Sequence, residues 1–204
     1  VGLRERLRWF DNRPLFGRRI LVTRTREQAS QLSALLRQQG AFPIEFPVIA
    51  TAPPLDFAAF DDALSRLATN DWVIFTSVNG VQAAVFRLRQ LGKDVRAFGA
   101  ARLCAIGPAT AGALEQAGLR VDFVPQEYVA EAIAEGIGDV AGQHILLPRA
   151  DLAREKLADE LTNRGALVEE VTAYRTVLPE DREGETLRAK LAAHELDMIT
   201  FTSS

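Results

Sequence analysis

DWVIFTSVNG (residues 71–80) and DMITFTSS (residues 197–204) each read as a short apolar strand that ends in Phe-Thr-Ser. A longer pair has nearly the same separation: GRRILVTRTREQASQLSALLRQQGA (residues 17–41) aligns without gaps on GQHILLPRADLAREKLADELTNRGA (residues 142–166). The offset is 125 residues for the long pair and 126 residues for the short pair. Two matches at almost one spacing predict an internal duplication.

Strands and helices alternate along both copies. The first copy opens with a buried strand at 20–23 and a helix at 27–39, whose leucines recur at helical spacing and whose stop is Gly40. Further strands are predicted at 44–50, 72–76, 103–106, 144–147 and 168–177, and further helices at 57–67, 78–91, 152–164 and before 118. This alternation predicts an α/β fold with parallel sheets that helices cover on both faces.

The composition excludes several classes of protein. Charged residues, 25% of the chain, interrupt every apolar run before the roughly 18 residues that a membrane span needs. A net charge of −3 argues against a general nucleic-acid binder. Cys104 is the one cysteine, which fits a reducing compartment, and with two histidines the chain offers few ligands for zinc. We therefore expect a cytoplasmic protein with no membrane, nucleic-acid or metal partner.

Residues 1–16 are predicted to be an extension or linker ahead of the fold. Eight arginines fall within residues 1–26, against only Glu5 and Asp11, and the stretch lacks the apolar centre of a signal peptide. A solvated linker or appended helix is one interpretation. The other is a basic collar that attracts an acidic substrate.

Candidate binding residues lie where predicted strands end. In parallel sheets, ligands bind at the carboxyl ends of the strands, where helix N-termini offer unpaired N–H groups to anions. Small, hydroxylated or glycine-containing strand ends predict a cleft that holds carboxylates or phosphates through main-chain donors. The candidates are Arg24, Thr76, Ser77, Val78, Asn79, Gly107, Thr110, Ala111, Arg149 and Ser203.

Several of these candidates also have a purely structural interpretation. Ser77 and Thr110 suit plain helix caps, and Arg24 and Arg149, which are equivalent in the repeat, suit braces within their own sheets. Neither GxGxxG nor GxxxxGK occurs at the predicted strand ends, so a nucleotide site has little support.

Tyr174 is the candidate catalytic residue. It lies in VTAYRTV, within the strand predicted at 168–177, where a phenol can donate a proton or a hydrogen bond to a leaving oxygen. Packing is the alternative role for this side chain. His144 falls within a strand and His194 near a helix end, so both suit structural roles, and no catalytic triad is indicated.

Six segments together resemble the uroporphyrinogen-III synthases. They follow the family's order across residues 17–204 and read ILVTRTREQASQLSALLRQQGA, DWVIFTSVNGV, CAIGPATAGALEQAGL, FVPQEYVAEAI, ILLPRADLAREKLADELTNRGALVEEVTAYRT and DMITFTSS. The portion that completes the family's first domain has no counterpart after residue 204, so we expect the sequence to be a fragment.

The resemblance implies two Rossmann-like parallel-sheet domains joined by a two-stranded β connector, with the second domain inserted in the first. Domain 1 takes residues 17–46 and 179–204, and domain 2 takes residues 54–169. The connector strands take residues 47–53 and 170–178.

The resemblance also implies the cyclising dehydration of hydroxymethylbilane to uroporphyrinogen III, in haem, sirohaem and cobalamin biosynthesis, without a cofactor or metal. Hydroxide leaves the ring A hydroxymethyl group, the substituted carbon of ring D attacks the resulting azafulvene, and a spiro intermediate fragments and recloses with ring D inverted. By this resemblance Tyr174 matches a tyrosine that assists loss of hydroxide. Thr110 matches a cleft threonine, and Ser77 and Ser203 match polar residues at strand ends.

The resemblance further implies a monomer. Residues 1–10 are similar to the tail of a uroporphyrinogen-III methyltransferase, which some bacteria fuse ahead of the synthase, although a lone amphipathic extension is the alternative. Two other functions stay open: a non-catalytic two-domain module that binds an anionic ligand, and a Rossmann-type nucleotide transferase. The lack of a signal peptide argues against the first, and the lack of a phosphate loop argues against the second.

Overall fold

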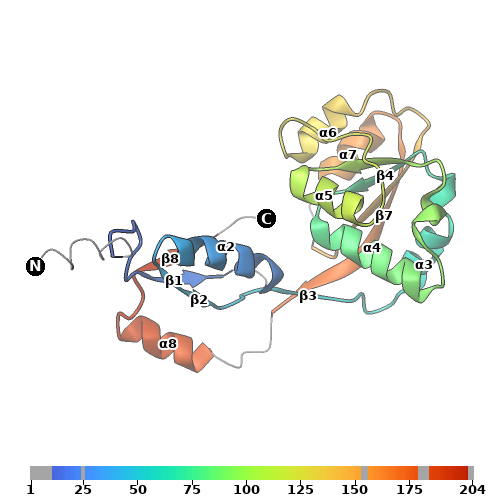
Figure 1. The fold of residues 1–204 in the computed structure, drawn as a ribbon. Coiled ribbons are helices and arrows are strands. Elements are labelled where there is room, and N and C mark those ends of the chain that lie inside the picture. Colours follow the sequence, from blue (N-terminus) through green and yellow to red (C-terminus); the bar gives the residue numbers. More distant parts are fainter. Residues whose placement is uncertain (1–10, 24–25, 153–155, 179–183, 202–204) are drawn as a thin grey trace, which may run out of the picture. The chain divides into compact units, whose positions relative to one another are not determined.

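The computed structural model describes residues 11–23, 26–152, 156–178 and 184–201, without the side chains of residues 26–28. The chain divides into two units, one formed by Val1–Ala50 with Val177–Ser204 and the other by Thr51–Thr176 (Figure 1). Each unit contains its own sheet, so the two are described separately.

The first unit is built on a three-stranded parallel sheet in the order β2-β1-β8. β1 (Arg19–Val22) is the central strand, and β2 (Phe42–Glu45) and β8 (Met198–Thr200) pair with its two edges. Helix α2 (Arg26–Gln38) packs against β1 and β2, and α8 (Gly184–Ala192) precedes β8 in the chain. Because all three apolar residues of β1 are buried, this strand forms the core of the unit.

The second unit is built on a five-stranded sheet in the order β3-β7-β6-β4-β5, in which β7, β6, β4 and β5 run parallel. Its strands are β3 (Ala50–Ala52), β4 (Trp72–Phe75), β5 (Arg102–Ala105), β6 (His144–Ala150) and β7 (Leu167–Val177). Its helices are α3 (Ala58–Ser65), α4 (Val78–Gln90), α5 (Pro108–Gln116), α6 (Ala130–Gly136) and α7 (Lys156–Asn163), with 3-10 turns η1 (Leu67–Thr69) and η2 (Val95–Phe98).

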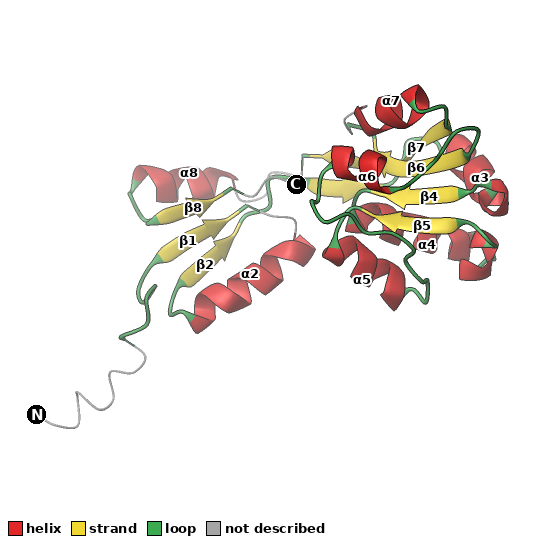
Figure 2. Cartoon of the chain, turned by 90° about the horizontal axis from the view of Figure 1, so that it is seen from above, coloured by secondary structure: helices red, strands yellow, loops and turns green. Residues whose placement is uncertain are grey.

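Alternate residues of the central strands face opposite sides of this sheet. Val73 and Phe75 of β4 join one apolar cluster with side chains of α3, α4 and α5, whereas Trp72 and Ile74 join another with side chains of α6 and α7. Helices accordingly lie on both sides of the sheet in Figure 2. The predicted α/β fold, with a parallel sheet covered on both faces, is confirmed for this unit.

The internal repeat is preserved in the pairing of the strands. β1 pairs with β2 so that Arg19 lies opposite Phe42, and β6 pairs with β7 so that His144 lies opposite Leu167, each residue 125 positions further on. The strands of the short repeat also pair in equivalent ways, but across copies. β8 of the second copy pairs with β1 of the first copy, and β4 of the first copy pairs with β6 of the second copy. Each unit therefore combines strands from both copies, and the two copies pair in equivalent registers.

Asp71 and Asp197, which open the two short repeats, make equivalent hydrogen bonds. The Asp71 carboxylate accepts the backbone N–H of His144 at 2.8 Å, and the Asp197 carboxylate accepts that of Arg19 at 2.7 Å. Each aspartate also donates its own N–H to the carbonyl oxygen of the same partner, at 2.9 Å. Hydrogen bonds to a charged acceptor are the stronger kind, so each aspartate fixes where its strand begins against its neighbour.

Helices α2 and α7 also end in equivalent ways. Gly40 and Gly165 follow them with φ angles of 89° and 87°, which glycine adopts without the penalty that a Cβ atom brings. The N–H of Gly17 donates to the carbonyl of Gly40 at 3.2 Å, and the N–H of Gly142 donates to that of Gly165 at 2.8 Å. The predicted helix stop at Gly40 is therefore confirmed, together with its counterpart in the second copy.

Several predicted boundaries are wrong. The helix expected at 57–67 ends at Ser65, and the 3-10 turn η1 follows it. The strand expected at 44–50 ends at Glu45, because Pro47 has no N–H to continue the ladder. Helices α6 and α8 lie in segments where no helix was predicted. Residues 153–155, within the helix expected at 152–164, lie outside the described residues.

The N-terminal segment is only in part an extension. Within residues 11–16, the N–H of Leu15 donates to the carbonyl of Gln39 at 3.0 Å, so this stretch lies against the end of α2. Arg18 and Arg19 of the predicted basic collar both form ion pairs with Asp197. Residues 1–10, for which a methyltransferase tail was one interpretation, lie outside the described residues.

The first unit should lose stability in acid through Asp197. The pKa of this carboxyl is held below its ordinary value of 3.8, chiefly by the Arg19 N–H that it accepts and further by the guanidinium groups of Arg19 and Arg18, although burial opposes the shift. Because the pKa is lower in the folded state, the stabilisation is complete above the unfolded value and is lost as pH falls through the folded value.

Hydrogen exchange of the β1 amides, corrected for intrinsic rates and followed from about pH 6 to about pH 3, measures this effect. The wild-type amides should lose protection as pH falls. Asp197→Asn, which cannot ionise, should start with less protection and change little with pH. The same pH dependence in both proteins would contradict this role for Asp197.

Candidate functional site

The parallel strands of the second unit end at one level. Phe75 of β4 lies opposite Ala105 of β5, and the pairing of β6 with β4 and β7 brings Pro148 and Val171 to the same height. Helices α4 and α5 begin directly beyond β4 and β5. Strand ends and helix N-termini therefore share one edge of the sheet. We call it the carboxyl edge, made of residues 76–79, 107–111, 149–150 and 172–174.

Ser77 is the N-cap of α4 at this edge. Its backbone is extended, with φ −160° and ψ 154°, and its Oγ accepts the N–H of Gly80 at 3.0 Å. A serine oxygen in this position satisfies one of the N–H groups that a helix leaves without an internal partner. The predicted cap at Ser77 is confirmed.

Tyr174 reaches Ser77 from another strand. It lies near the end of β7, opposite Ala150, where the pairing of β6 with β7 shifts register after Arg149. Its Oη lies 3.0 Å from Ser77 Oγ, and either oxygen can be the donor. Its half-buried ring packs against the apolar cluster beneath α4, so Tyr174 combines packing with a polar contact at the edge.

Gly80 explains how α4 comes close enough for this contact. A Cβ atom at Gly80 would lie 3.0 Å from the carbonyl oxygen of Pro148 on β6 and 3.4 Å from Ser77 Oγ. Glycine thus lets the first turn of α4 pack directly on the end of β6. The strand order places β6 between β7 and β4, and the tyrosine side chain spans that distance.

The start of α5 is built differently. Gly107 is its N-cap without a side-chain hydrogen bond, and Pro108 follows in the first turn. Thr110 is buried, with 3% of its surface exposed, and lies inside the first turn, so its interpretation as a cap is wrong. Ala111 is half-buried and packs against the apolar cluster of α4 and α5.

Tyr128 was not among the residues singled out from the sequence. It follows a segment that runs beside β5, and its ring lies against Gly107. The stretch PQEYVAEAI marked the family resemblance, but nothing in that pattern separates a ring at a sheet edge from an ordinary loop tyrosine.

The remaining candidates differ in what surrounds them. Arg149 forms an ion pair with Glu170 of β7, and its side chain is 12% exposed, so it braces β6 against β7. Thr76, Val78 and Asn79 are half-buried around Ser77. Arg24 and Ser203 lie outside the described residues.

The described residues offer little other chemistry. They contain no cluster of histidine, cysteine and carboxylate side chains that could hold a metal ion. Burial raises the pKa of the Cys104 thiol to about 12, so it stays protonated at neutral pH and is a poor nucleophile. Among the described helices, none is long and apolar enough to cross a bilayer.

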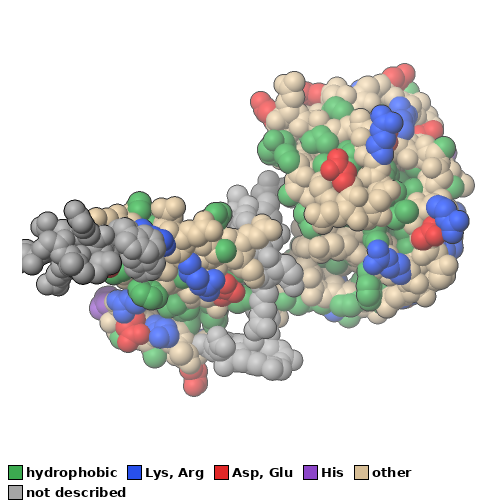
Figure 3. Space-filling view, in the orientation of Figure 1, with side chains coloured by type: hydrophobic (Ala, Val, Ile, Leu, Met, Phe, Trp, Pro, Cys, Tyr) green, Lys and Arg blue, Asp and Glu red, His purple; other side chains and the backbone are tan. Residues whose placement is uncertain are grey.

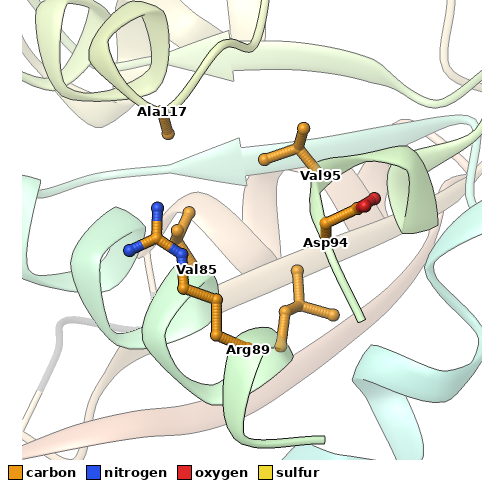
Figure 4. A pocket seen from close by; sticks show the side chains of 6 residues that line it. Val85, Arg89, Asp94, Val95 and Ala117 are labelled. Carbon is orange, nitrogen blue, oxygen red and sulfur yellow. The ribbon is translucent and has the colours of Figure 1, made fainter. Parts of the chain in front are cut away.

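A small hollow of about 220 Å³ lies elsewhere on the second unit. Figure 4 shows its side chains converging from the later turns of α4, the segment before η2 and the end of α5. Asp94 at its rim is already paired with Arg96, and its N-cap bond to the Arg96 N–H is 2.9 Å long. None of the predicted site residues lines this hollow.

Charge is mixed on the molecular surface. Basic and acidic side chains are interspersed on the face shown in Figure 3, and the net charge of the chain is −3. Among the described residues on this face, no patch of a single sign dominates.

Comparison with known proteins identifies the family. The model of a family described as uroporphyrinogen-III synthase HemD matches residues 30–204. The chain belongs to this family. Its reaction is that of a cyclising hydro-lyase of tetrapyrrole biosynthesis, and the alternatives of a non-catalytic module and a nucleotide transferase are not favoured.

Individual relatives agree with this assignment. The uroporphyrinogen-III synthase of Synechococcus elongatus is 37% identical over 193 residues, which cover 94% of this chain and 72% of that protein. The porphyrin biosynthesis protein HemD of Ruminiclostridium josui is 31% identical over 205 residues, but the match takes only 40% of its length. A mutant uroporphyrinogen III synthase from Thermus thermophilus aligns with a TM-score of 0.68 and 25% identity, covering 92% of this chain and 73% of that structure.

Two substitutions at Ser77 test whether its hydroxyl group stabilises the start of α4. Ser77→Ala should lower the free energy of unfolding by about 1 kcal/mol, because the Gly80 N–H loses its cap. Ser77→Thr keeps a capping oxygen and should cost clearly less. Urea unfolding of the two variants measures this, and equal losses would show that the hydroxyl is not the stabilising group.

Proposed function

We propose that the carboxyl edge of the second unit binds hydroxymethylbilane and that Tyr174 assists loss of hydroxide from its ring A hydroxymethyl group. The observation that carries this proposal is the 3.0 Å contact between Tyr174 Oη and Ser77 Oγ. Ser77 Oγ in turn accepts the N–H of Gly80, so the phenol is coupled to the positive end of α4. Negative charge that develops on the phenol is stabilised by this arrangement.

One of the two possible directions of the Ser77–Tyr174 hydrogen bond leaves the phenol proton available to the substrate. A serine hydroxyl donates one proton, and Ser77 Oγ already accepts the Gly80 N–H. When Ser77 donates its proton to Tyr174 Oη, the phenol's own proton is free for the leaving oxygen. As the C–O bond breaks, that oxygen takes the proton and departs as water, and the phenolate keeps the hydrogen bond from Ser77.

The remaining steps need orientation more than proton transfer. The substituted carbon of ring D attacks the cation that remains when water has left, and the spiro intermediate fragments and recloses with ring D inverted. Ring closure releases one proton from the attacking ring, and its return to the phenolate restores Tyr174. A bilane held so that the substituted carbon faces the cation gains the rate advantage of a pre-oriented reaction.

The carboxylates of the substrate suit the main-chain donors at this edge. N–H groups in the first turns of α4 and α5 point towards the end of the sheet, and the helix dipoles favour negative charge there. Arg149 takes part by holding β6 against β7 beside Tyr174. The proposed substrate-binding residues are Arg24, Thr76, Ser77, Val78, Asn79, Gly107, Thr110, Ala111, Arg149 and Ser203.

We also propose that the second unit is an inserted Rossmann-like domain, with residues 47–53 and 170–178 as connector strands. In support, β3 falls inside the first of these ranges, β7 extends through most of the second, and the two strands are neighbours in one sheet. A monomeric state and a fused or neighbouring methyltransferase stay predictions from the sequence.

The isomer that the protein makes tests the function itself. Hydroxymethylbilane generated by its deaminase closes in water, without inversion, to the type I product. Addition of the purified protein should redirect the product to the type III isomer, which chromatography separates after oxidation to the porphyrins. Formation of type I alone, at the rate seen without protein, would contradict the assignment.

Tyr174→Phe should lower kcat by about ten- to a hundredfold, since it removes the phenol proton and keeps the ring that packs in the core. Ser77→Ala should lower kcat by a smaller factor and should add little further loss in the Tyr174→Phe background, because it acts through the phenol. Steady-state rates of the two single variants and the double variant measure this. An unchanged rate for Tyr174→Phe would mean that Tyr174 serves only in packing. Additive losses in the double variant would mean that Ser77 does not act through Tyr174.

A further inference from the structure

The chain contains two tyrosines. Tyr174 belongs to the carboxyl edge of the second unit, and the ring of Tyr128 lies against Gly107 of that edge. Tyr174 approaches the N-terminus of α4 from the β7 side. Tyr128 lies on the other side, against Gly107 at the end of β5. Only Tyr174 takes part in the proposed proton transfer, and Tyr128 has no role in that step.

The Tyr128 ring lies in the space that a side chain at position 107 would enter. Its φ of −169° and ψ of 177° describe extended backbone, which any residue adopts, so the conformation does not demand glycine. A Cβ atom at this position would lie 3.2 Å from both Cδ1 and Cγ of Tyr128. The Tyr128 ring therefore packs on the backbone of Gly107, where the absence of a Cβ atom leaves room for it.

Strand pairing places this ring beside the proposed reaction centre. The N–H of Ile106 donates to the carbonyl of Phe75 at 3.0 Å, so Gly107 lies next to the end of β4, where Ser77 caps α4. The order β7-β6-β4-β5 puts Tyr174 and Tyr128 on opposite sides of that cap.

The segment that carries Tyr128 is anchored to the sheet. Phe123 forms a parallel bridge with Cys104, its carbonyl accepts the N–H of Ala105 at 3.0 Å, and the Asp122 carboxylate accepts the N–H of Leu103 at 2.8 Å. Tyr128 nevertheless keeps 60% of its surface exposed. It is a large aromatic ring, packed on the backbone of Gly107 and open to solvent, in the connection between α5 and α6. Figure 1 shows the course of this connection.

We infer that Tyr128 is a substrate-positioning residue whose exposed ring stacks on one pyrrole ring of the bilane. The inference rests on the proposed function, since a pyrrole is a flat, electron-rich ring of the kind that stacks offset on a phenol. A ring held at this edge restricts rotation of one pyrrole about its bridging carbon, which is the orientation that closure with inversion requires. The contact needs the aromatic face and not the hydroxyl.

The test combines changes at Tyr128 with a change at Gly107. Tyr128→Phe should behave like wild type, because the ring remains. Tyr128→Leu should raise KM for hydroxymethylbilane by about two- to tenfold and increase the fraction of type I product, with a smaller change in kcat. Gly107→Ala should have a smaller effect in the same direction, because its Cβ would shift the ring by a few tenths of an ångström.

The double variant and a control isolate the contact. In the Tyr128→Leu background, Gly107→Ala should add little, because the ring it displaces is already gone. Gly112→Ala, in the same helix and with no atom within 4 Å of the added Cβ, should leave KM and the isomer ratio unchanged. Thermal unfolding of each variant shows whether the fold is retained. Among the folded variants, the comparison of Tyr128→Phe with Tyr128→Leu shows whether the aromatic ring is required.

The possible outcomes distinguish a failure of the proposed function from a failure of the stacking role of Tyr128. If wild type makes no type III product, the proposed function fails. If wild type makes it and Tyr128→Leu has the same KM and isomer ratio, the stacking role is overturned. If Tyr128→Phe loses as much as Tyr128→Leu, the hydroxyl is the active group and the stacking role is likewise overturned.

Discussion

The register of β4 between β6 and β5 is the constraint on which the site depends. It sets the ends of these strands at one height, and the starts of α4 and α5 follow from it. Once α4 begins there, its cap Ser77 is within hydrogen-bond distance of a tyrosine two strands away. A shift of one residue in β4 would turn its alternate side chains to the wrong face and would move the cap away from Tyr174.

Duplication explains the architecture better than the chemistry. Asp71 and Asp197 each accept a backbone N–H from the neighbouring strand, so the same interaction occurs once in each unit. In both units it joins strands of different copies. At the two offsets of the repeat, 125 and 126 residues, position 174 corresponds to Ile49 or Val48, neither of which has a hydroxyl group. The two copies thus share the way in which strands are paired and helices are stopped, whereas the phenol belongs to one copy alone.

Much of the fold was predictable because its signals are local. Buried apolar strands, helical leucine spacing, the stop at Gly40 and the cap at Ser77 all depend on neighbours in the sequence. Helix α6 is only seven residues long and α8 has a weakly amphipathic pattern, so periodicity did not reveal either. The contact of Ser77 with Tyr174 and that of Gly107 with Tyr128 join residues far apart in the chain, and only the strand order brings them together.

The claim that the carboxyl edge is the ligand-binding edge can be measured directly. Amide chemical shifts of the labelled protein, titrated with uroporphyrinogen III kept reduced under anaerobic conditions, compare this edge with the opposite end of the same strands. We expect the largest shifts in residues 76–80, 107–111 and 172–174. Shifts concentrated at Asp71, Arg102 and His144, where these strands begin, would contradict it.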